Sequence, residues 1–294
     1  MDIIKSCQVL PSPDINVNSN CLDLFGQDFI LVKILGQPSS FGIVYQVKNH
    51  AHAQFALKVT AFVPTTIHEL QVNCQISTTI LDPTYSLSFI RLHEWFVCTQ
   101  PPPQWRLRQP PRIYSTIWEQ RLLYYLMELA DGTLESLQIP LNEYDIKCMM
   151  FELLYALAVG RKLLSFSHND IKADNILIKT SPSKRIYTLN GAKYICNTPY
   201  LPLFGDFGLS KTNNDPDINT DDIFDLYATI ANFIEEYDLD ENFVHELNDF
   251  FGIEVDSHRS NYSTILNLLT SPFFYQLTTD RGTLSNTVVI TPLF

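Results

Sequence analysis

The 294-residue sequence lacks several patterns that point to particular classes of protein. None of its six cysteines stands in a C-x-x-C pair, so we expect neither a zinc site nor a disulfide framework but reduced, mostly buried thiols. No stretch approaches the roughly 18 apolar residues that a membrane-spanning helix requires, and the N-terminus lacks the apolar run of a signal peptide. We therefore expect a soluble, intracellular protein with no membrane partner.

Positive charge is scarce as well. The sequence has 20 lysine and arginine residues against 32 aspartate and glutamate residues, which gives a formal net charge of −12. Because nucleic acids bind best to positively charged surfaces, we expect no nucleic-acid partner. With 46% hydrophobic and 12% aromatic residues, the chain has enough apolar side chains for a substantial core, in one large domain or two small ones.

Strand-like patterns dominate the first part of the chain. We expect strands at 29–47 (interrupted by the loop GQPSSFG), 54–60, 89–98 and 122–128. Pro64 precedes a helical segment, and we expect Thr66 at its N-cap. The proline-rich stretch between the last two strands is too broken for regular structure.

Helical patterns dominate the second part. Asn142 opens a capping-box pattern that is followed by apolar residues at helical spacing, and Thr220 opens a second amphipathic helix. The sequence therefore predicts an α+β fold of two lobes, the first rich in strands and the second helical. The expected division is an N-terminal extension at 1–25, a first lobe at 26–129 and a second lobe at 130–294.

The octapeptide HNDIKADN at 168–175 contains the residue types that phosphoryl transfer from ATP requires: a carboxylate that accepts the proton of the acceptor hydroxyl, and groups that position metal ions and phosphates. It resembles the catalytic loop of protein kinases, H-R-D-x-K-x-x-N, with the same aspartate-to-asparagine spacing. The resemblance implies a catalytic base at Asp170 and a γ-phosphate contact at Lys172. It also implies a metal ligand at Asn175 and structural support from His168. A polar turn between a helix and a strand is the plain alternative.

Two more motifs stand in the chain order that protein kinases use. The segment GDFG resembles the D-F-G element, whose aspartate, here Asp206, binds the magnesium that bridges the ATP phosphates. The segment ALKV resembles V-A-I-K, whose lysine, here Lys58, holds the α- and β-phosphates. Its expected partner is Glu69, although the spacing from Thr66 to Glu69 also fits a capping box.

The segment GQPSSFGIV resembles the loop G-x-G-x-x-G-x-V, which covers the ATP phosphates. Ser39 stands near the place of the middle glycine, and Pro38 resembles an inserted residue that offers no N–H to a phosphate. We therefore expect weaker nucleotide binding than a complete glycine-rich loop gives, with a plain β-hairpin as the alternative. The ATP contacts that the resemblance implies in this part of the chain are Gly36, Ser39, Gly42, Val44 and Ala56.

Two supporting motifs complete the resemblance. The segment YLMELADG resembles the hinge between kinase lobes, which implies Met127 as gatekeeper and adenine contacts from backbone groups of Glu128 and Ala130. An apolar strand followed by an Asp-Gly turn is the plain alternative. Leu177 is a further implied ATP contact. The segment TDDIFDL resembles the start of the helix whose aspartate, here Asp222, braces the catalytic loop, although helix N-capping explains its acids equally well.

The sequence departs from the kinase pattern in several places. Asn169 replaces the arginine that gathers a phosphorylated activation loop in many kinases, so we do not expect that form of switching. The interval 206–222 is short and contains no A-P-E, so the usual peptide-docking segment is largely missing. We expect inserted loops, at 181–202 or near Arg106, to substitute for it. The basic residues of the loop expected at 181–202 are Lys184, Arg185 and Lys193.

The order of these motifs identifies a divergent, compact member of the eukaryotic-type protein kinase superfamily, viral or protist, nearest to the casein-kinase and vaccinia-related group. The resemblance implies a monomeric, ATP-dependent serine/threonine kinase that uses Mg²⁺, with Mn²⁺ as a substitute, and acts on a protein substrate. We expect it in the cytoplasm or in the nucleus of a host cell. Two alternatives stay open: a pseudokinase that acts as a binding scaffold, and a small-molecule kinase of the aminoglycoside or choline type.

Overall fold

The computed structural model describes most of the chain. The described residues are 7, 29–39, 42–98, 121–136, 140–181, 183–212, 221–235, 237, 239–255, 262–280 and 284–294. The chain divides into two compact units. One consists of Met1–Thr78 and Arg91–Leu129, and the other of Thr79–Ile90 and Ala130–Phe294. The short segment Thr79–Ile90 thus belongs to the second unit, although the sequence pattern groups it with the first lobe.

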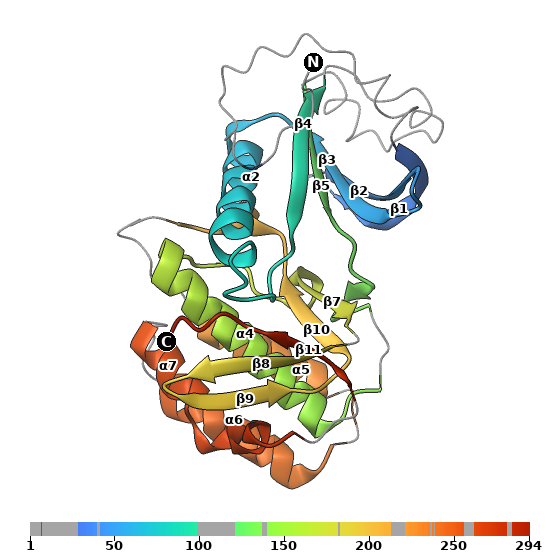
Figure 1. Cartoon of the computed structure of the whole chain (residues 1–294). Helices are drawn as coiled ribbons and strands as arrows, with labels where there is room; N and C mark the ends of the chain where they lie inside the picture. The colour runs from blue at the N-terminus through green and yellow to red at the C-terminus, as the bar shows by residue number, and fades with distance from the viewer. Residues whose placement is uncertain are drawn as a thin grey trace. The chain divides into compact units, whose positions relative to one another are not determined.

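The first unit is built on an antiparallel five-stranded sheet with the strand order β1-β2-β3-β5-β4 (Figure 1). Its elements are β1 (Phe29–Ser39), β2 (Gly42–Asn49), β3 (Gln54–Ala61), β4 (Leu92–Cys98), β5 (Leu122–Glu128) and α2 (Pro64–Ile76), which continues in the π-helical turn Ser77–Leu81. Successive side chains of a strand point to opposite faces of the sheet. On β5, Tyr124 packs with Val47 and Leu57 in one core cluster. Tyr125 packs with Leu70 of α2 in another, so β5 is buried on both faces.

Helix α2 begins one turn earlier than the sequence analysis expected. Pro64 is its first residue, a position where the missing N–H of proline has no cost, and Val63 is the N-cap. Thr66 therefore lies inside the first turn, and the prediction of an N-cap at Thr66 is wrong. Its Oγ1 accepts a hydrogen bond from Val63 N at 3.2 Å and donates one to Ala61 O at 2.6 Å.

The second unit contains most of the helices. Its helical elements are α4 (Glu143–Leu164), α5 (Asp222–Ile234), α6 (Glu241–Val255), α7 (Tyr262–Leu269) and the 3₁₀ turns η3 (Ala173–Asn175), η4 (Phe207–Leu209) and η5 (Pro272–Thr278). Helix α4 begins as predicted, because Asn142 Oδ1 accepts from Asp145 N at 3.0 Å and Asp145 Oδ2 accepts from Asn142 N at 3.2 Å. Its residues are buried without interruption from Asp145 to Gly160, so α4 is the central helix of this unit.

Two three-stranded sheets accompany these helices, with the orders β10-β7-β6 and β11-β8-β9. The strands are β6 (Gly132–Thr133), β7 (Ile176–Thr180), β8 (Ser183–Leu189), β9 (Ala192–Cys196), β10 (Tyr200–Phe204) and β11 (Asn286–Val289). Asn190 and Gly191 join β8 to β9 with φ angles of 50° and 80°, as a two-residue hairpin turn requires. The prediction of a loop at 181–202 is therefore wrong. The Asn-Gly turn and the alternating burial along β8 are the signals of a hairpin.

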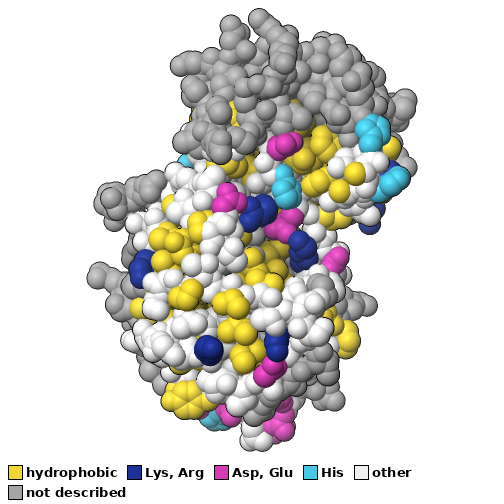
Figure 2. Space-filling model, viewed as in Figure 1, with side chains coloured by type: hydrophobic (Ala, Val, Ile, Leu, Met, Phe, Trp, Pro, Cys, Tyr) yellow, Lys and Arg dark blue, Asp and Glu magenta, His cyan; other side chains and the backbone are white. Residues whose placement is uncertain are grey.

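The predicted α+β, protein-kinase-like class with a strand-rich lobe and a helical lobe is confirmed by the two units, although the second unit carries more sheet than expected. Among the described helices, none has the length and hydropathy needed to cross a membrane. On the face shown in Figure 2, the basic and acidic side chains of the described residues are interspersed and do not gather by sign.

Several other expectations meet the structure only in part. The strand expected at 89–98 begins at Leu92, and Phe89 forms an isolated bridge with Phe204 instead. Of the described cysteines, all are free thiols and all but Cys7 are buried. The expectations for Arg106, for Thr220 and for the extension at 1–25 other than Cys7 lie outside the described residues.

Candidate functional site

The segment 165–175 connects α4 to β7 in the second unit and contains the predicted octapeptide. Ser165 caps the end of α4 in a left-handed conformation with a φ of 49°, and Phe166 is fully buried. Ser167 and Lys211 exchange two backbone hydrogen bonds, at 3.0 Å and 2.9 Å. The segment is therefore anchored on a buried helix at one end and on a strand at the other, which holds its side chains in defined positions.

Three of the predicted residues meet at the carboxylate of Asp170. Lys172 Nζ donates to Asp170 Oδ2 at 2.7 Å, and Asn175 Nδ2 donates to the same oxygen at 2.8 Å. Asn175 Nδ2 also donates to the main-chain oxygen of Asp170 at 2.9 Å, which closes the turn between them. The hydrogen bond to Asp170 raises the pKa of Lys172, so this ammonium group is charged at neutral pH. The side chains of Lys172 and Asp170 are 53% and 28% exposed, so a substrate can reach both.

Asp222, in the first turn of α5, holds the backbone of this segment. Its carboxylate accepts hydrogen bonds from His168 N at 3.1 Å and from Asn169 N at 3.0 Å, and it is almost fully buried. Arg161 Nη2 lies 3.3 Å from Asp222 Oδ2. The N-cap of α5 is Asp221, whose side chain makes no capping hydrogen bond, so capping does not account for Asp222. Sequence reasoning missed Arg161, because basic residues are common in the last turn of a helix, where they interact favourably with the helix dipole.

His168 links the segment to the strand that precedes Asp206. The side chain is fully buried, and its Nε2 lies 3.0 Å from Gly205 O. Burial lowers the pKa of His168 in spite of the opposing charge of Asp222, so the imidazole is neutral at pH 7. Because a carbonyl oxygen only accepts, the proton of the neutral ring is on Nε2. The ring also packs against Phe204 and Phe207, at 5.3 Å and 5.7 Å between ring centroids.

Asp206 follows Gly205 and adopts a left-handed conformation with a φ of 57°. Gly205 N donates to Asn175 O at 2.9 Å, so the residue before Asp206 is bonded directly to the 165–175 segment. A Cβ atom on Gly205 would lie 3.0 Å from the side chain of Leu177, so the close approach favours glycine. The side chain of Asp206 is exposed, and its charge adds to the rise in the pKa of Lys172. The structure thus brings Asp206 close to the other predicted residues of the second unit.

Asn169 stands where the kinase pattern has arginine. Its φ is 61°, in the left-handed region that asparagine adopts more readily than most residues. Its Nδ2 donates to Leu209 O at 3.0 Å and to Ser167 Oγ at 3.2 Å. Asn169 therefore ties the segment to the 3₁₀ turn that follows Asp206. Sequence reasoning missed this link, although the turn-forming tendency of asparagine is a signal for it.

In the first unit, Lys58 Nζ lies 2.5 Å from Glu69 Oε1, which joins β3 to α2. Because Thr66 is not the N-cap of α2, the ion pair and not a capping box accounts for Glu69. Lys58 Nζ also lies 5.9 Å from the ring centroid of Tyr125, whose hydroxyl donates to Thr66 O at 2.5 Å. Val44 on β2 stands opposite Lys58 in the strand register.

The glycine-rich segment lies at the β1–β2 connection. Gly36 and Gly42 have φ angles of 64° and 148°, which other residues rarely adopt. A Cβ atom on Gly42 would also collide with Val59 O, so the position requires glycine on two grounds. The side chain of Ser39 lies outside the described residues, and Ala56 is buried in β3.

The residues expected to contact adenine are divided between the units. Met127 and Glu128 end β5 in the first unit, whereas Ala130 and Leu177 belong to the second. Glu128 N donates to Arg91 O at 2.9 Å, and Glu128 Oε1 accepts from Arg91 N at 2.8 Å. These bonds fix the end of β5. The adenine contacts themselves stay predictions.

One family model and two known proteins that are similar to this chain are kinases by name. Residues 134–280, half of the chain, match the family model described as poxvirus serine/threonine protein kinase. Over 115 residues the chain is 31% identical to a probable kinase of Invertebrate iridescent virus 3, which covers 36% of this chain and 22% of that protein. Over 102 residues it is 29% identical to a probable serine/threonine-protein kinase of Dictyostelium discoideum, which covers 30% of this chain and 8% of that protein. The chain thus spans less than a quarter of either relative.

Proposed function

The chain belongs to the poxvirus serine/threonine protein kinase family, and we propose that it transfers the γ-phosphate of ATP to serine and threonine hydroxyls of a protein substrate. One observation carries the proposal: the side chains of Lys172 and Asn175 converge on Asp170 Oδ2, at 2.7 Å and 2.8 Å. A carboxylate, an ammonium group and an amide at one solvent-accessible point are the groups that phosphoryl transfer uses.

The catalytic base in this proposal is Asp170. Lys172 and Asn175 orient its Oδ2, while its Oδ1 has no hydrogen-bond donor among the described residues. An acceptor hydroxyl that donates to Oδ1 transfers its proton to that carboxylate as its oxygen bonds to the γ-phosphorus. The bond between the γ-phosphorus and the β,γ-bridging oxygen breaks in the same step, and ADP is the leaving group. The ammonium group of Lys172 then lies close enough to offset the negative charge of the phosphoryl group.

The residues of the second unit also fit a magnesium ion. Among the described residues, no three His, Cys, Asp or Glu side chains gather into a metal site. Magnesium in kinases needs no such cluster, because it binds through one or two protein oxygens and takes the rest of its shell from phosphates and water. The carboxylate of Asp206 and Asn175 Oδ1 supply suitable oxygens, since Asn175 uses its Nδ2 for Asp170. Bound there, Mg²⁺ neutralises charge on the ATP phosphates, and Mn²⁺ accepts the same ligands.

The first unit contributes the contact to the α- and β-phosphates in this proposal. The pair Lys58–Glu69 is mostly buried, at 12% and 7% side-chain exposure. Glu69 therefore limits the positions that the ammonium group of Lys58 samples, which favours a fixed contact with a phosphate oxygen.

The test is transfer of radiolabelled phosphate from ATP, with magnesium, to casein, to myelin basic protein and to the protein itself. Wild type is compared with Asp206→Ala and with the matched control Asp174→Asn, which changes an exposed acid of the same segment. We expect label on serine or threonine in wild type and control but not in Asp206→Ala. Equal labelling by wild type and Asp206→Ala would refute the assignment of Asp206 as a metal ligand.

The same assay separates the two alternative functions. If wild type transfers no label but ATP and magnesium raise its melting temperature, the chain is a nucleotide-binding scaffold. Transfer that occurs only to a small alcohol identifies a small-molecule kinase.

A further inference from the structure

The hairpin of β8 and β9 interrupts the chain between Asp170 and Asp206 and lies against α4 (Figure 1). One of its links to α4 is the ion pair of Arg185 and Glu152, whose side chains are both 0% exposed. Removing two charges from water is unfavourable unless their hydrogen bonds are all satisfied. Two well-packed apolar side chains of similar volume often stabilise a protein as much as a buried ion pair does, or more. What the ion pair adds here is a set of directed hydrogen bonds that hold the neighbouring segments in fixed positions.

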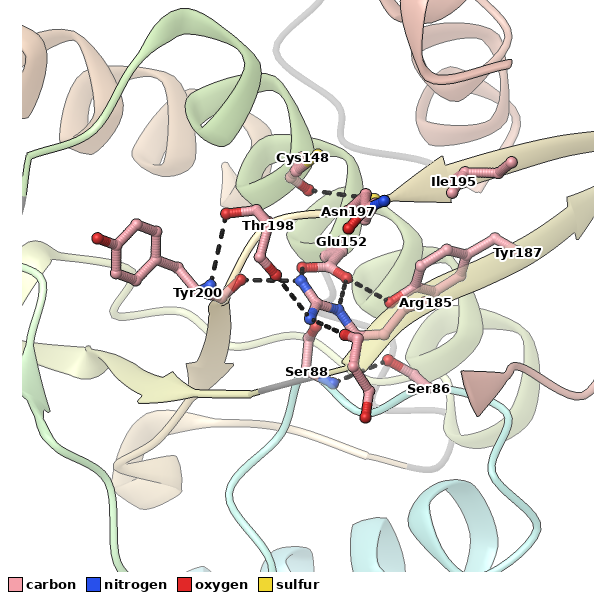
Figure 3. A network of polar contacts seen from close by, with 12 residues as sticks. Ser86, Ser88, Cys148, Glu152, Arg185, Tyr187, Ile195, Asn197, Thr198 and Tyr200 are labelled. Atoms are coloured by element: carbon pink, nitrogen blue, oxygen red, sulfur yellow. Dashed lines mark hydrogen bonds and ion pairs between the residues drawn. The ribbon is translucent and has the colours of Figure 1, made fainter. Parts of the chain in front are cut away.

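Arg185 satisfies every one of its donors (Figure 3). Its Nε and Nη2 donate to the two carboxylate oxygens of Glu152, at 2.5 Å and 3.2 Å. The other donors of the guanidinium reach three main-chain oxygens: those of Ser183 at 2.9 Å, Thr198 at 3.1 Å and Tyr200 at 2.9 Å. One planar group thus fixes the distances between α4, β8 and the first residue of β10.

Glu152 is held just as firmly. Besides Arg185, it accepts a hydrogen bond from the hydroxyl of Tyr187 at 2.8 Å, and Tyr187 is fully buried. Thr198, whose main-chain oxygen binds Arg185, also donates its hydroxyl to Asp145 Oδ1 at 2.5 Å near the start of α4. In Figure 3, Arg185 links Tyr200, the first residue of β10, to Glu152 on α4. The bond from Thr198 to Asp145 adds a second link to α4 just before β10.

β10 leads directly to Asp206. It pairs with β7 in continuous register from Tyr200 opposite Thr180 to Phe204 opposite Ile176. On its other edge, Phe204 N donates to Ser88 O at 3.0 Å. The far end of β10 is thus fixed by Phe204 and by the next residue, which bonds to Asn175 and His168, while its near end is fixed by Arg185.

Such fixing matters because β10 is a weak strand on its own. Pro202 lies in its middle and has no N–H to donate to the sheet. A slip of one residue would turn every side chain of the strand to the opposite face and displace Asp206. The bonds from Arg185 to Thr198 O and Tyr200 O oppose such a slip at the start of β10.

We propose that Arg185, oriented by Glu152, is a positioning residue for Asp206: it sets the register of β10 and thereby places the metal-binding carboxylate beside the 165–175 segment. This inference rests on the proposed function, because it assigns Asp206 to magnesium. Arg185 touches neither substrate nor metal. Its effect is transmitted through the main chain of β10 and Gly205.

The first experiment uses Arg185→Lys, which keeps the charge but offers fewer donors than the bonds it must replace. Phosphate transfer is measured over a range of magnesium concentrations, and hydrogen–deuterium exchange is measured without nucleotide. We expect the half-saturating magnesium concentration to rise about tenfold, with a smaller change in kcat at saturating magnesium. We also expect faster amide exchange confined to residues 200–206.

Two controls separate positioning from stability. Lys184→Gln removes an exposed ion pair with Asp280 from the same strand, and Ile265→Val loosens the core at α7. Both should leave the magnesium dependence and the exchange of 200–206 unchanged, since a variant that is merely less stable lowers the amount of active protein only. If Ile265→Val shifts the magnesium dependence as Arg185→Lys does, the positioning role is refuted.

A second variant covers the case in which Arg185→Lys does not fold. Arg185→Met with Glu152→Met removes both charges and keeps the volume, so it leaves no uncompensated buried charge. A folded double variant with a raised magnesium requirement and faster exchange at 200–206 supports the proposal. A folded double variant with wild-type values of both overturns it. The exchange measurement needs no transferase activity, so failure of this inference is distinct from failure of the proposed kinase function.

Discussion

Two charged clusters in the second unit differ in their exposure to solvent and in how far apart their members lie in the sequence. In the 165–175 segment, Lys172 and Asp170 are two positions apart in the sequence, and their side chains are 53% and 28% exposed. In the network of Figure 3, Arg185 and Glu152 are separated by 33 residues and are both 0% exposed. The exposed pair can exchange its partners for a substrate, whereas the buried pair has no solvent to replace a lost partner. In the proposals above, charge serves catalysis in the first cluster and the positioning of β10 in the second.

The comparison predicts that substitutions in the two clusters affect different quantities. An exposed ion pair contributes about 0–1 kcal/mol to stability, because water competes with it. Removing one partner of a buried pair costs about 3–5 kcal/mol, because the other charge stays buried without compensation. Activity should thus be sensitive in the 165–175 segment, and the free energy of unfolding should be sensitive at the hairpin.

The largest expected effect is on activity, in Asp170→Asn. Loss of the proposed general base should lower the rate of phosphate transfer by about 10²–10⁴-fold, while the free energy of unfolding changes by less than about 1 kcal/mol. Initial rates with ATP and magnesium, together with urea unfolding, test both statements, and Asp174→Asn is the control. An unchanged rate would remove Asp170 from the mechanism, and a large loss of stability would erase the contrast between the clusters.

The largest expected effect on stability is in Glu152→Ala. This change leaves the guanidinium of Arg185 buried without its carboxylate, so the free energy of unfolding should fall by about 3–5 kcal/mol. The matched control is Glu246→Ala, which removes the 61%-exposed partner of Lys147 and should cost less than about 1 kcal/mol. Urea unfolding measures both. Equal losses in the two variants would mean that burial does not distinguish these pairs.

The same contrast explains which parts of the site were predictable. The groups around Asp170 come from one octapeptide, so their spacing in the sequence is enough to predict that they meet. Asp222 was predicted from a motif, but its partner Arg161 was not, because no local pattern joins residues of different helices. The pair of Arg185 and Glu152 is a still harder case, since only the folded hairpin brings its members together.

The fold was predictable to a similar degree. The alternation of strands and the capping box at Asn142 predicted the elements that local sequence determines. The hairpin at 183–196 was misread as a loop, because the kinase motifs used for comparison include no strand at these residues. Asn190 and Gly191 are nevertheless a strong signal of a hairpin turn. Thr66 was misplaced because its hydroxyl suits both an N-cap and the first turn of a helix that begins with proline.

A smaller effect is expected from pH, at the histidine that joins the 165–175 segment to Gly205. Because burial lowers the pKa of His168, the unfolded chain, with a histidine pKa near about 6.5, binds more protons below that pH than the folded chain does. The free energy of unfolding should therefore fall as pH drops below about 6.5. It should fall less in His168→Gln, whose amide can still donate to Gly205 O.

Urea unfolding at about pH 7.5 and about pH 5.5 tests this prediction. The control is His245→Gln, which changes a histidine whose side chain is 76% exposed and should retain the wild-type dependence on pH. If His168→Gln loses stability in parallel with wild type, protonation of the buried ring does not contribute to the acid sensitivity, and the 165–175 segment is more open to water than its hydrogen bonds indicate.

The smallest expected effect is in Asp225→Asn on α5, between the extremes of the two clusters. Burial, with the charges of Asp222, Asp221 and Asp170, raises the pKa of Asp225 to about 6. Because this pKa lies above the value of about 3.9 in an unfolded chain, the folded chain binds more protons between the two values, and that stabilisation is lost as pH rises through about 6. Asp225→Asn should therefore raise the free energy of unfolding at about pH 7.5. The gain should be less than about 1 kcal/mol, because water screens a half-exposed group, and it should vanish near about pH 4.

The control is Asp249→Asn, at a carboxylate that is 70% exposed. A gain that is equal at both pH values would arise from packing and not from charge, and α5 would then carry no electrostatic strain toward Asp170.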